Sequence, residues 1–207
     1  MSAQHPTKRR AKGEARERLL VEAATAAIAE RGLANVRVSD IAERAGMSTG
    51  HVTYYYPSKS SLLMLAIQHS EEELHRQTAL ELAQIRDPWR RLYALVDLAA
   101  PHGTRDRGWV LWLEAWANAG LDEHLSKVQA ELVDRWRTRL TEVIRYGCGT
   151  GAFATDDPES VSTLLSCLLD GLSVEVMLGE GTMDLARLKV LFARAAEAHL
   201  SPATSDA

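Results

Sequence analysis

The sequence predicts an all-α protein of about nine helices. Apolar residues recur at steps of three and four along most of the chain, as they do on the buried face of an amphipathic helix. No segment shows the alternation of apolar and polar residues between hairpin turns that is typical of half-buried strands. With 207 residues, 46% of them hydrophobic, the chain can form one large or two small domains around a core.

The N-terminal segment is basic and then helical. Residues 1–12 carry four Lys and Arg among small polar residues, which predicts a flexible basic arm. Such an arm can contact DNA or remain a solvated tail without a role. Residues 13–31 then have the spacing of an amphipathic helix, and Gly32 can end it.

Residues 38–59 predict a helix-turn-helix. Apolar residues at 38, 41, 42 and 45 share one helix face, Ser39 is a plausible N-cap, and Gly46 can end that helix in the left-handed conformation. A second helix over residues 49–56 would turn Val52 and Tyr56 inward. The alternative is a helical hairpin that only packs within an ordinary core.

The outward face of the second helix carries small, hydrogen-bonding and flat side chains, which suit base edges, sugars and phosphates in a major groove. Gly50 would let the helix backbone approach DNA closely because it has no side chain. Lys59, at the start of the next helix, can reach a phosphate. The predicted DNA-contacting residues are Arg37, Ser39, Arg44, Ser48, Thr49, Gly50, His51, Thr53, Tyr54, Tyr55 and Lys59.

Residues 41–50 (IAERAGMSTG), followed by residues 55–59 (YYPSK), resemble the DNA-binding domain of the TetR family of bacterial transcriptional regulators. The resemblance covers about residues 16–66, with two departures from the usual pattern at Thr53 and Tyr56. It implies a helix-turn-helix of the kind that dimers use to read two half-sites about 34–36 Å apart. It also implies a long helix after Lys59 that links the DNA-binding domain to the body.

The uneven charge of the chain supports this interpretation. The net formal charge is −4, yet residues 1–60 hold ten Lys and Arg against six Asp and Glu, a net of +4, and the remainder carries −8. A basic head on an acidic body is typical of a DNA-binding domain attached to another domain. We therefore expect an arm over residues 1–12, a DNA-binding domain over 13–58 and a regulatory, dimerising domain over 59–207.

The body is predicted to hold the remaining helices. Ser58 can cap a long helix that runs towards Ile85, and the dipeptides Asp87-Pro88 and Asp157-Pro158 each place an N-cap before a proline at the first helical position. The expected helices cover residues 88–100, 104–119, 121–146, 158–178 and 184–200. The cluster of glycines at 147–151 lacks the Lys-Ser/Thr of a phosphate-binding loop, so we interpret it as a helix C-cap and flexible connection.

Residues 161–178 are apolar over more than one stripe, so one side could face the core and the other a second subunit. A homodimer is therefore expected, and a fully buried helix in a monomer is the alternative. No run approaches the roughly 18 apolar residues of a membrane span, and the N-terminus has no apolar signal region. A cytoplasmic protein is the simplest interpretation.

Trp109, Trp112 and Trp116 fall on one face of the helix over residues 104–119. Such a stripe is core more often than ligand site. The sharper hypothesis is an aromatic effector pocket, in which Glu114, Asp170 or Glu175 would supply counter-charge to a cation. A structural hydrogen bond or dimer contact is the alternative role for Asp170. The candidate ligand-binding residues are Trp109, Trp112, Leu113, Trp116, Trp136, Glu114 and Asp170.

Residues 112–116 (WLEAW) and 169–172 (LDGL) resemble the C-terminal domain of the BetI-type subgroup, repressors of choline-to-betaine genes. The resemblance implies a small-molecule sensor, with a cationic or aromatic effector, that dimerises through its last two long helices. Cys148 and Cys167 lie in no zinc-like cluster, and no nucleophile elbow or HExxH motif occurs. We expect no cofactor, no metal and no enzymatic activity.

The expected function is that of a ligand-responsive DNA-binding transcriptional regulator, a dimeric repressor that leaves a palindromic double-stranded operator when its effector binds. The alternative is a helical small-molecule-binding protein or enzyme in which the helix-turn-helix is purely structural.

Overall fold

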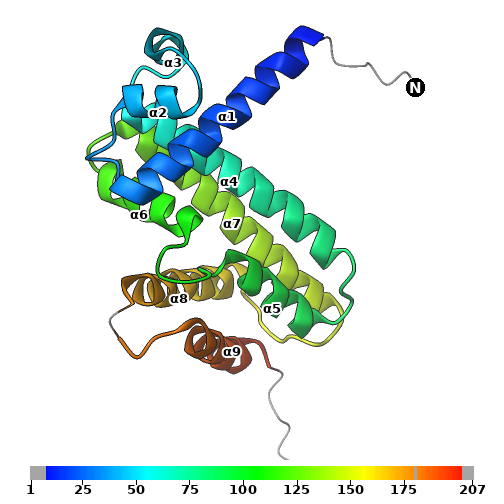
Figure 1. Ribbon diagram of the computed structural model, residues 1–207. Helices are drawn as coiled ribbons and strands as arrows, with labels where there is room; N and C mark the ends of the chain where they lie inside the picture. The colour runs from blue at the N-terminus through cyan, green and yellow to red at the C-terminus, as the bar shows by residue number, and fades with distance from the viewer. Residues whose placement is uncertain (1–7, 180, 202–207) are drawn as a thin grey trace, which may run out of the picture. The chain divides into compact units, whose positions relative to one another are not determined.

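The computed structural model describes residues 8–179 and 181–201, with side chains from residue 13 onward. These residues form nine α-helices and no strand (Figure 1), which confirms the all-α prediction. The helices are α1 (Lys8–Arg31), α2 (Val38–Arg44), α3 (Thr49–Tyr55), α4 (Lys59–Leu82), α5 (Pro88–Ala99), α6 (Arg107–Ala119), α7 (Glu123–Gly149), α8 (Pro158–Leu178) and α9 (Leu185–Leu200).

The first helix begins earlier than the sequence suggests. Of the arm expected over residues 1–12, residues 1–7 lie outside the described part of the chain, and residues 8–12 belong to α1. The flexible arm therefore stays a prediction for residues 1–7 alone.

Side-chain caps fix where several helices start, as predicted. The carboxylates of Asp87 and Asp157 accept hydrogen bonds from the backbone N–H groups of Arg90 (2.7 Å) and Ser160 (3.0 Å). Ser58 and Ser61 cap α4 reciprocally, each hydroxyl oxygen accepting the other residue's N–H at 3.1 Å. Each of these bonds satisfies an N–H that the helix itself cannot pair.

The start of α2 corrects one expectation. Ser39 is not its N-cap, because the helix already begins at Val38 with Arg37 as the capping residue. Asp40, in the first turn, accepts a hydrogen bond from the backbone N–H of Arg37 at 3.4 Å. The Ser39 hydroxyl instead lies 3.4 Å from Asp40 Oδ1, to which it donates.

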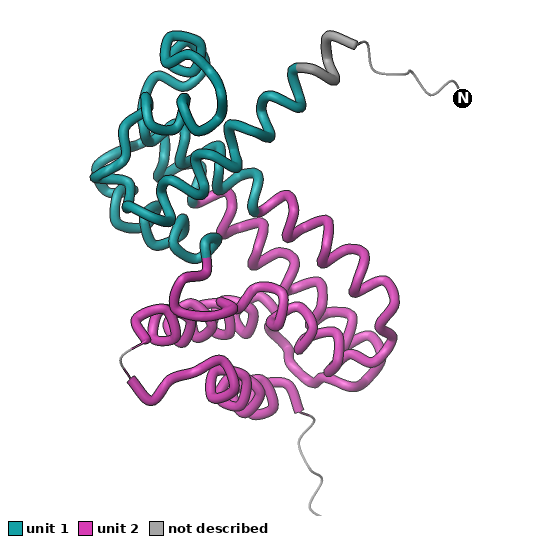
Figure 2. Tube along the Cα trace, viewed as in Figure 1, with its two compact units in different colours: residues 1–70, 107–129 teal, residues 71–106, 130–207 magenta. Residues whose placement is uncertain are grey.

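The chain forms two compact units (Figure 2). The first combines the chain up to residue 70 with residues 107–129, and the second combines residues 71–106 with residues 130–207. Helices α4 and α7 each begin in the first unit and end in the second. Packing therefore divides the chain differently from the functional boundary expected between residues 58 and 59.

In the first unit, α1 packs against α2 and α6, and α2 packs against α3. Its largest fully buried side chains come from α1, α2, α4, α6 and α7: Ile28, Ile41, Leu62, Leu63, Ile67, Leu111 and Leu125. Residues of the expected regulatory domain thus complete the core beneath the helix-turn-helix.

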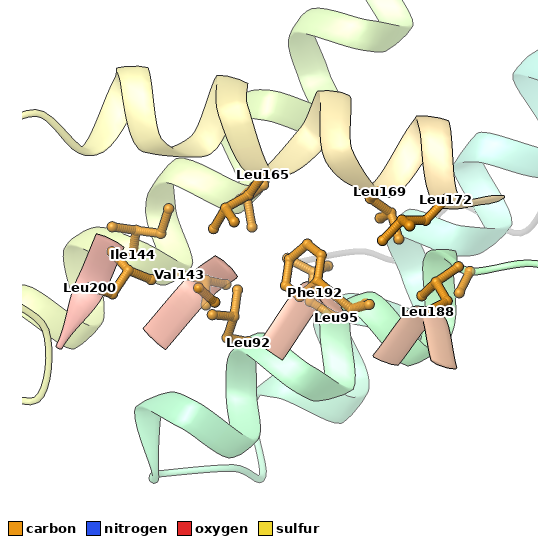
Figure 3. Close-up of a cluster of buried hydrophobic side chains, with 14 of the residues drawn as sticks. Leu92, Leu95, Val143, Ile144, Leu165, Leu169, Leu172, Leu188, Phe192 and Leu200 are labelled. Atoms are coloured by element: carbon orange, nitrogen blue, oxygen red, sulfur yellow. The ribbon is translucent and has the colours of Figure 1, made fainter. Parts of the chain in front are cut away.

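In the second unit, α9 packs against α8 and α5 around one hydrophobic core. Figure 3 shows Phe192 of α9 among leucines of α5 and α8. Trp136 of α7 packs against the edge of this core.

Among the described residues one helix, α8, is long and apolar enough to cross a membrane by length and composition alone. The expectation that no stretch approaches a membrane span is therefore too strong for α8. The core helix of a soluble protein meets the same criterion, and a single such helix does not indicate a membrane protein. Here α8 buries one side along α9 and leaves Leu164 and Leu178 exposed on the other.

The glycine cluster at 147–151 differs from the expected flexible connection. Helix α7 continues through Gly149, and only Gly151 has the left-handed backbone (φ 77°) that ends such a segment. Gly147 lies inside the helix, where the side chain of Phe153 packs directly over it. The segment is therefore a packed corner of the second unit.

Candidate DNA interface and effector site

Helix α3 buries Val52 and exposes its other side chains, as predicted, whereas Tyr56, also expected to turn inward on this helix, lies just after it as the C-cap and is only partly buried. Val52 is the buried residue, and Ser48 caps the helix by accepting a hydrogen bond from the His51 N–H at 3.2 Å. Tyr54 is 80% exposed and Tyr55 63%. Helix α3 packs against α2, and Val52 is its one buried residue, so most of its surface is free for another molecule.

The exposed rings of α3 support one another. The Tyr55 ring lies 4.8 Å from that of Tyr54 and 5.4 Å from that of His51, both in edge-to-face geometry. Edge-to-face pairs stabilise a ring arrangement beyond simple burial. The arrangement limits the rotamers of three predicted contact residues before any partner binds.

Two other α3 residues have a defined chemical role. The Thr53 hydroxyl donates to the Thr49 carbonyl at 3.0 Å, so its oxygen can still accept hydrogen bonds from a partner. An added Cβ at Gly50 would meet no atom within 4 Å, so this glycine is not required by packing within the protein. Close approach of the backbone to a partner remains a reason for its presence.

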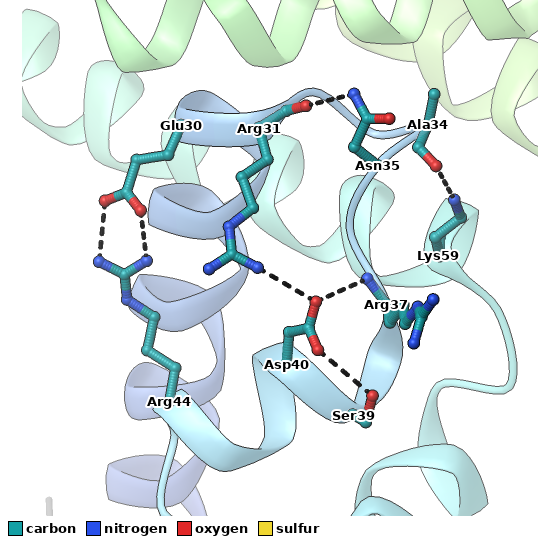
Figure 4. Close-up of polar contacts among 9 residues, drawn as sticks. All are labelled: Glu30, Arg31, Ala34, Asn35, Arg37, Ser39, Asp40, Arg44 and Lys59. Carbon is teal, nitrogen blue, oxygen red and sulfur yellow. Dashed lines mark hydrogen bonds and ion pairs between the residues drawn. The ribbon is translucent and has the colours of Figure 1, made fainter.

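On the α1–α2 side, the arginines are engaged with acidic side chains (Figure 4). Arg44 donates two hydrogen bonds to the Glu30 carboxylate, at 2.7 and 2.8 Å, and Arg31 contacts Asp40 at 3.2 Å. The hydrogen bond from Arg44 lowers the pKa of Glu30. Arg44, predicted to contact DNA, therefore already has a bidentate partner in the free protein.

These side chains surround a cavity. It has a volume of about 330 Å³ and is lined by Ala27, Arg31, Asp40, Glu43 and Arg44. Its lining is mostly charged and already paired, so we assign it no ligand.

Lys59 is also engaged. Its ammonium donates to the carbonyl of Ala34 at 2.8 Å, across the turn between α1 and α2 (Figure 4). The ammonium keeps two further donors, so the predicted phosphate contact stays chemically available. Sequence reasoning missed this bond because its two residues are 25 positions apart.

The seven candidate ligand-binding residues do not belong to one unit. Five of them, Trp109, Trp112, Leu113, Glu114 and Trp116, lie on α6 in the first unit, whereas Trp136 and Asp170 lie in the second.

The three α6 tryptophans form a continuous aromatic surface. The Trp116 ring lies 6.1 Å from the Trp109 ring, edge-to-face, and 6.1 Å from the Trp112 ring. Trp109 is buried, and Trp112 and Trp116 are partly exposed. The stripe is thus both core and accessible aromatic surface.

Glu114 is not a free counter-charge. Its Oε1 accepts a hydrogen bond from the backbone N–H of Leu33 at 2.9 Å, in a partly buried position. The Asn118 side chain donates to the Glu114 carbonyl at 2.7 Å. The structure therefore gives this carboxylate a structural role that periodicity alone did not indicate.

Asp170 is a partly buried carboxyl group on α8. Burial raises its pKa to about 6, although the positive charge of Arg137 opposes the rise. Arg137 also points a nitrogen toward the sulfur of Cys167, at 3.9 Å, and its Nε has no partner. Glu175, by contrast, is exposed and needs no partner.

Two family models match the chain. Residues 20–65 match the model described as bacterial regulatory proteins of the tetR family, and residues 88–201 match that of the C-terminal region of BetI-type transcriptional repressors. The HTH-type transcriptional regulator BetI of Proteus mirabilis is 30% identical over 84% of this chain and 86% of that protein. The chain belongs to the TetR family of transcriptional regulators, in its BetI-type group. Both resemblances seen in the sequence are confirmed.

Solved structures agree with this assignment. A transcriptional regulator from Saccharomonospora viridis, determined in complex with choline, is 31% identical, with a TM-score of 0.82 over 92% of this chain and 99% of that one. A TetR transcription regulator from Haloarcula marismortui is 25% identical, with a TM-score of 0.80 over 91% of this chain and 100% of that one.

Membership in this family settles the class of function. The chain is a DNA-binding transcriptional regulator of the TetR family and not an enzyme. An enzyme that keeps a helix-turn-helix only as structure is therefore set aside.

Proposed function

We propose that this regulator is a homodimeric repressor that binds a palindromic double-stranded operator and leaves it when a small cationic effector binds. The observation that carries the effector class is the similarity to the choline-bound regulator over almost the whole length of both chains. The chemistry of α6 supports it, because tryptophan faces attract quaternary ammonium groups.

The proposed DNA contacts are the exposed side chains of α3 and the residues around its start. Ser48, Thr49, Gly50, His51, Thr53, Tyr54 and Tyr55 would read or approach bases and phosphates, and Arg37, Ser39, Arg44 and Lys59 would contact the backbone. Of these, Arg44 would have to exchange its Glu30 partner for a phosphate. We keep the proposed functional boundary between residues 58 and 59, with Lys59 at the start of α4 as one DNA contact that lies just beyond it.

The proposed effector contacts are Trp112 and Trp116, supported by Trp109, whose ring packs on Trp116, and by Leu113 on the same helix. Glu114 is left out because Leu33 already occupies its carboxylate. Trp136 is left out because it packs against a core of the second unit.

A homodimer would use the outer faces of α8 and α9. Leu164, Leu178 and Val190 expose 46%, 66% and 51% of their surface there. Burying apolar surface of this kind in a second copy is favourable, and a two-fold dimer matches a palindromic operator. Because such regulators act on chromosomal DNA, we propose a cytoplasmic location.

The effector part is tested by fluorescence anisotropy with the full chain and labelled DNA from the promoter next to its gene. Choline should lower the affinity for this DNA at least fivefold, and glycerol at equal concentration should not. The variant Trp112→Ala should lose this response while it still binds DNA, and Leu80→Ala, at an exposed position of α4, is the control that should keep both. If choline leaves wild-type DNA affinity unchanged, the proposed effector class is wrong.

A further inference from the structure

The turn between α1 and α2 contains a backbone group that finds its partner far along the chain. Helix α1 ends at Arg31, and Gly32 takes the left-handed conformation (φ 74°) while its N–H donates to the Ile28 carbonyl at 2.8 Å. In a helix end of this type the following N–H needs a further acceptor. Leu33 is 5% exposed, and its N–H donates to Glu114 Oε1 at 2.9 Å.

Glu114 is held in place to accept this bond. Asn118, one helical turn later, donates to the Glu114 carbonyl at 2.7 Å and lies 3.5 Å from Oε2. An added Cβ at Gly32 would stand 3.0 Å from Glu114 Oε1, so the carboxylate lies tight against the turn. Since α1 packs along α6, the two helices keep this contact in register.

The same turn is held from another side. Lys59, the first residue of α4, donates to the carbonyl of Ala34 at 2.8 Å. Leu33 and Ala34 are consecutive, so adjacent peptide groups are fixed by side chains of α6 and α4. Beyond the turn, Asp40 binds both Arg31 and the N–H of Arg37, which ties the start of α2 to the end of α1. The direction in which α2 leaves the turn, and with it α3, therefore depends on these polar contacts.

A second polar link joins the start of α4 to the start of α7. Asp122 accepts hydrogen bonds from the N–H groups of His124 (3.0 Å) and Leu125 (3.1 Å), and its pKa is lowered by the Leu125 N–H and then by the Ser60 hydroxyl. The corner between α6 and α7 is thus linked to α4, the same helix whose Lys59 binds the α1–α2 turn. A movement of α6 should therefore also displace the α1–α2 turn.

We propose that Glu114 is the positioning residue through which α6 holds the α1–α2 turn in the DNA-binding arrangement. Trp112 and Trp116 lie two residues before and after it on the same helix, so a molecule that shifts α6 at the tryptophans moves the carboxylate away from Leu33. The inference rests on the proposed function for its effector step, whereas the positioning step concerns DNA binding alone.

The test compares Glu114→Ala, which removes the acceptor, with Glu114→Gln, which keeps an acceptor oxygen of the same reach. In the absence of choline, Glu114→Ala should bind promoter DNA about 5- to 150-fold more weakly than wild type, the usual range of coupling between sites. Glu114→Gln should bind within about threefold of wild type. Both variants should bind choline within about threefold of wild type by calorimetry, because the carboxylate is not a ligand group.

If Glu114→Ala does not fold, the inference can still be tested on the wild-type protein. Hydrogen exchange at the Leu33 amide of the wild-type protein should be slow and should speed up at least tenfold when choline is added. If both variants keep wild-type DNA affinity, or if choline releases DNA while Leu33 exchange is unchanged, the inference is wrong. Loss of choline binding in Glu114→Gln would also overturn it, in favour of a counter-charge role.

Failure of the proposed effector is recognised separately. If choline does not bind the wild-type protein, the effector class is wrong, yet weaker DNA binding by Glu114→Ala still supports the positioning role. If the wild-type protein binds no promoter DNA, the proposed function itself fails.

Discussion

The ring of Phe153 occupies the space in which residue 147 would carry a side chain. An added Cβ at Gly147 would stand 2.0 Å from Cδ2 of this ring, a distance that no real Cβ contact tolerates. Phe153 is buried beside Trp89, with ring centroids 4.6 Å apart, so it has little room to move. Glycine at this helix position is therefore a packing requirement.

Gly147→Ala should consequently destabilise the protein by about 1–3 kcal/mol, because overpacking a buried ring forces the backbone or the ring to shift. Urea denaturation measures this loss. Gly149→Ala is the matched control, since its added Cβ meets nothing within 4 Å and alanine favours helix. Equal stability of the two variants would contradict the packing of Phe153 over Gly147.

Asp170 predicts a pH dependence of stability. Because burial raises its pKa to about 6 in the folded protein, the folded state holds a proton that the unfolded state releases near pH 4. Its contribution to stability is full at low pH and is lost as the pH rises through about 6. As the pH rises from 4.5 to 7.5, the free energy of unfolding of Asp170→Asn should therefore increase by about 1–2 kcal/mol relative to that of wild type.

Thermal denaturation of both proteins across that pH range checks the sign. Asp97→Asn is a suitable control, because Asp97 is half exposed and pairs with Lys189 on the surface. A difference between wild type and Asp170→Asn that does not change with pH would argue against a raised pKa.

The face of α3 predicts two kinds of DNA-binding defect. His51→Ala and Thr53→Ala should reduce the preference for the operator over unrelated DNA, since both side chains lie on the exposed face of α3 that we propose reads the bases. Lys59→Ala should weaken binding to all sequences alike and reduce the slope of log affinity against log salt by about 1. Competition titrations at several salt concentrations separate the two effects, with His75→Ala as a control.

Gly50→Ala isolates the role of close approach. The variant should fold normally, because its Cβ meets no protein atom. It should nevertheless bind the operator at least tenfold more weakly if the α3 backbone lies against DNA. Unchanged affinity in the folded variant would move the contact away from Gly50.

The Glu30–Arg44 pair gives a prediction of opposite sign. Glu30→Gln removes the charged partner of Arg44 and one negative charge near the proposed interface. We expect tighter DNA binding. The slope of log affinity against log salt concentration should become steeper by about one unit. Arg44→Ala should then abolish the gain. If Glu30→Gln does not change the slope, Arg44 only braces α1 against α2.

The features that sequence alone predicted are those written into local residue order. Asp87 and Asp157 start their helices as expected because an N-cap needs only the next three residues. The exposed face of α3 followed from helical periodicity in the same way. Ser39 was misplaced as a cap because α2 already begins at Val38, and Asp40, not Ser39, supplies the local bond, to the N–H of the capping residue Arg37.

The features that sequence could not predict depend on distant partners. No residue near Glu114 in the sequence indicates that its carboxylate accepts a hydrogen bond from the backbone N–H of Leu33, which is 81 residues away. Gly147 looks like a helix terminator until the ring of Phe153 is placed over it. The seven candidate ligand residues were grouped by chemistry, and packing assigns them to two units. Tertiary contacts decide all three cases.

The central claim is sequence-selective DNA binding by a dimer, and a footprinting titration of the full chain on the promoter next to its gene tests it directly. We predict two protected half-sites related by a two-fold axis, with a stoichiometry of two chains per site and an affinity that falls steeply with salt. Uniform protection without preferred sites, or no protection at low salt, would contradict it.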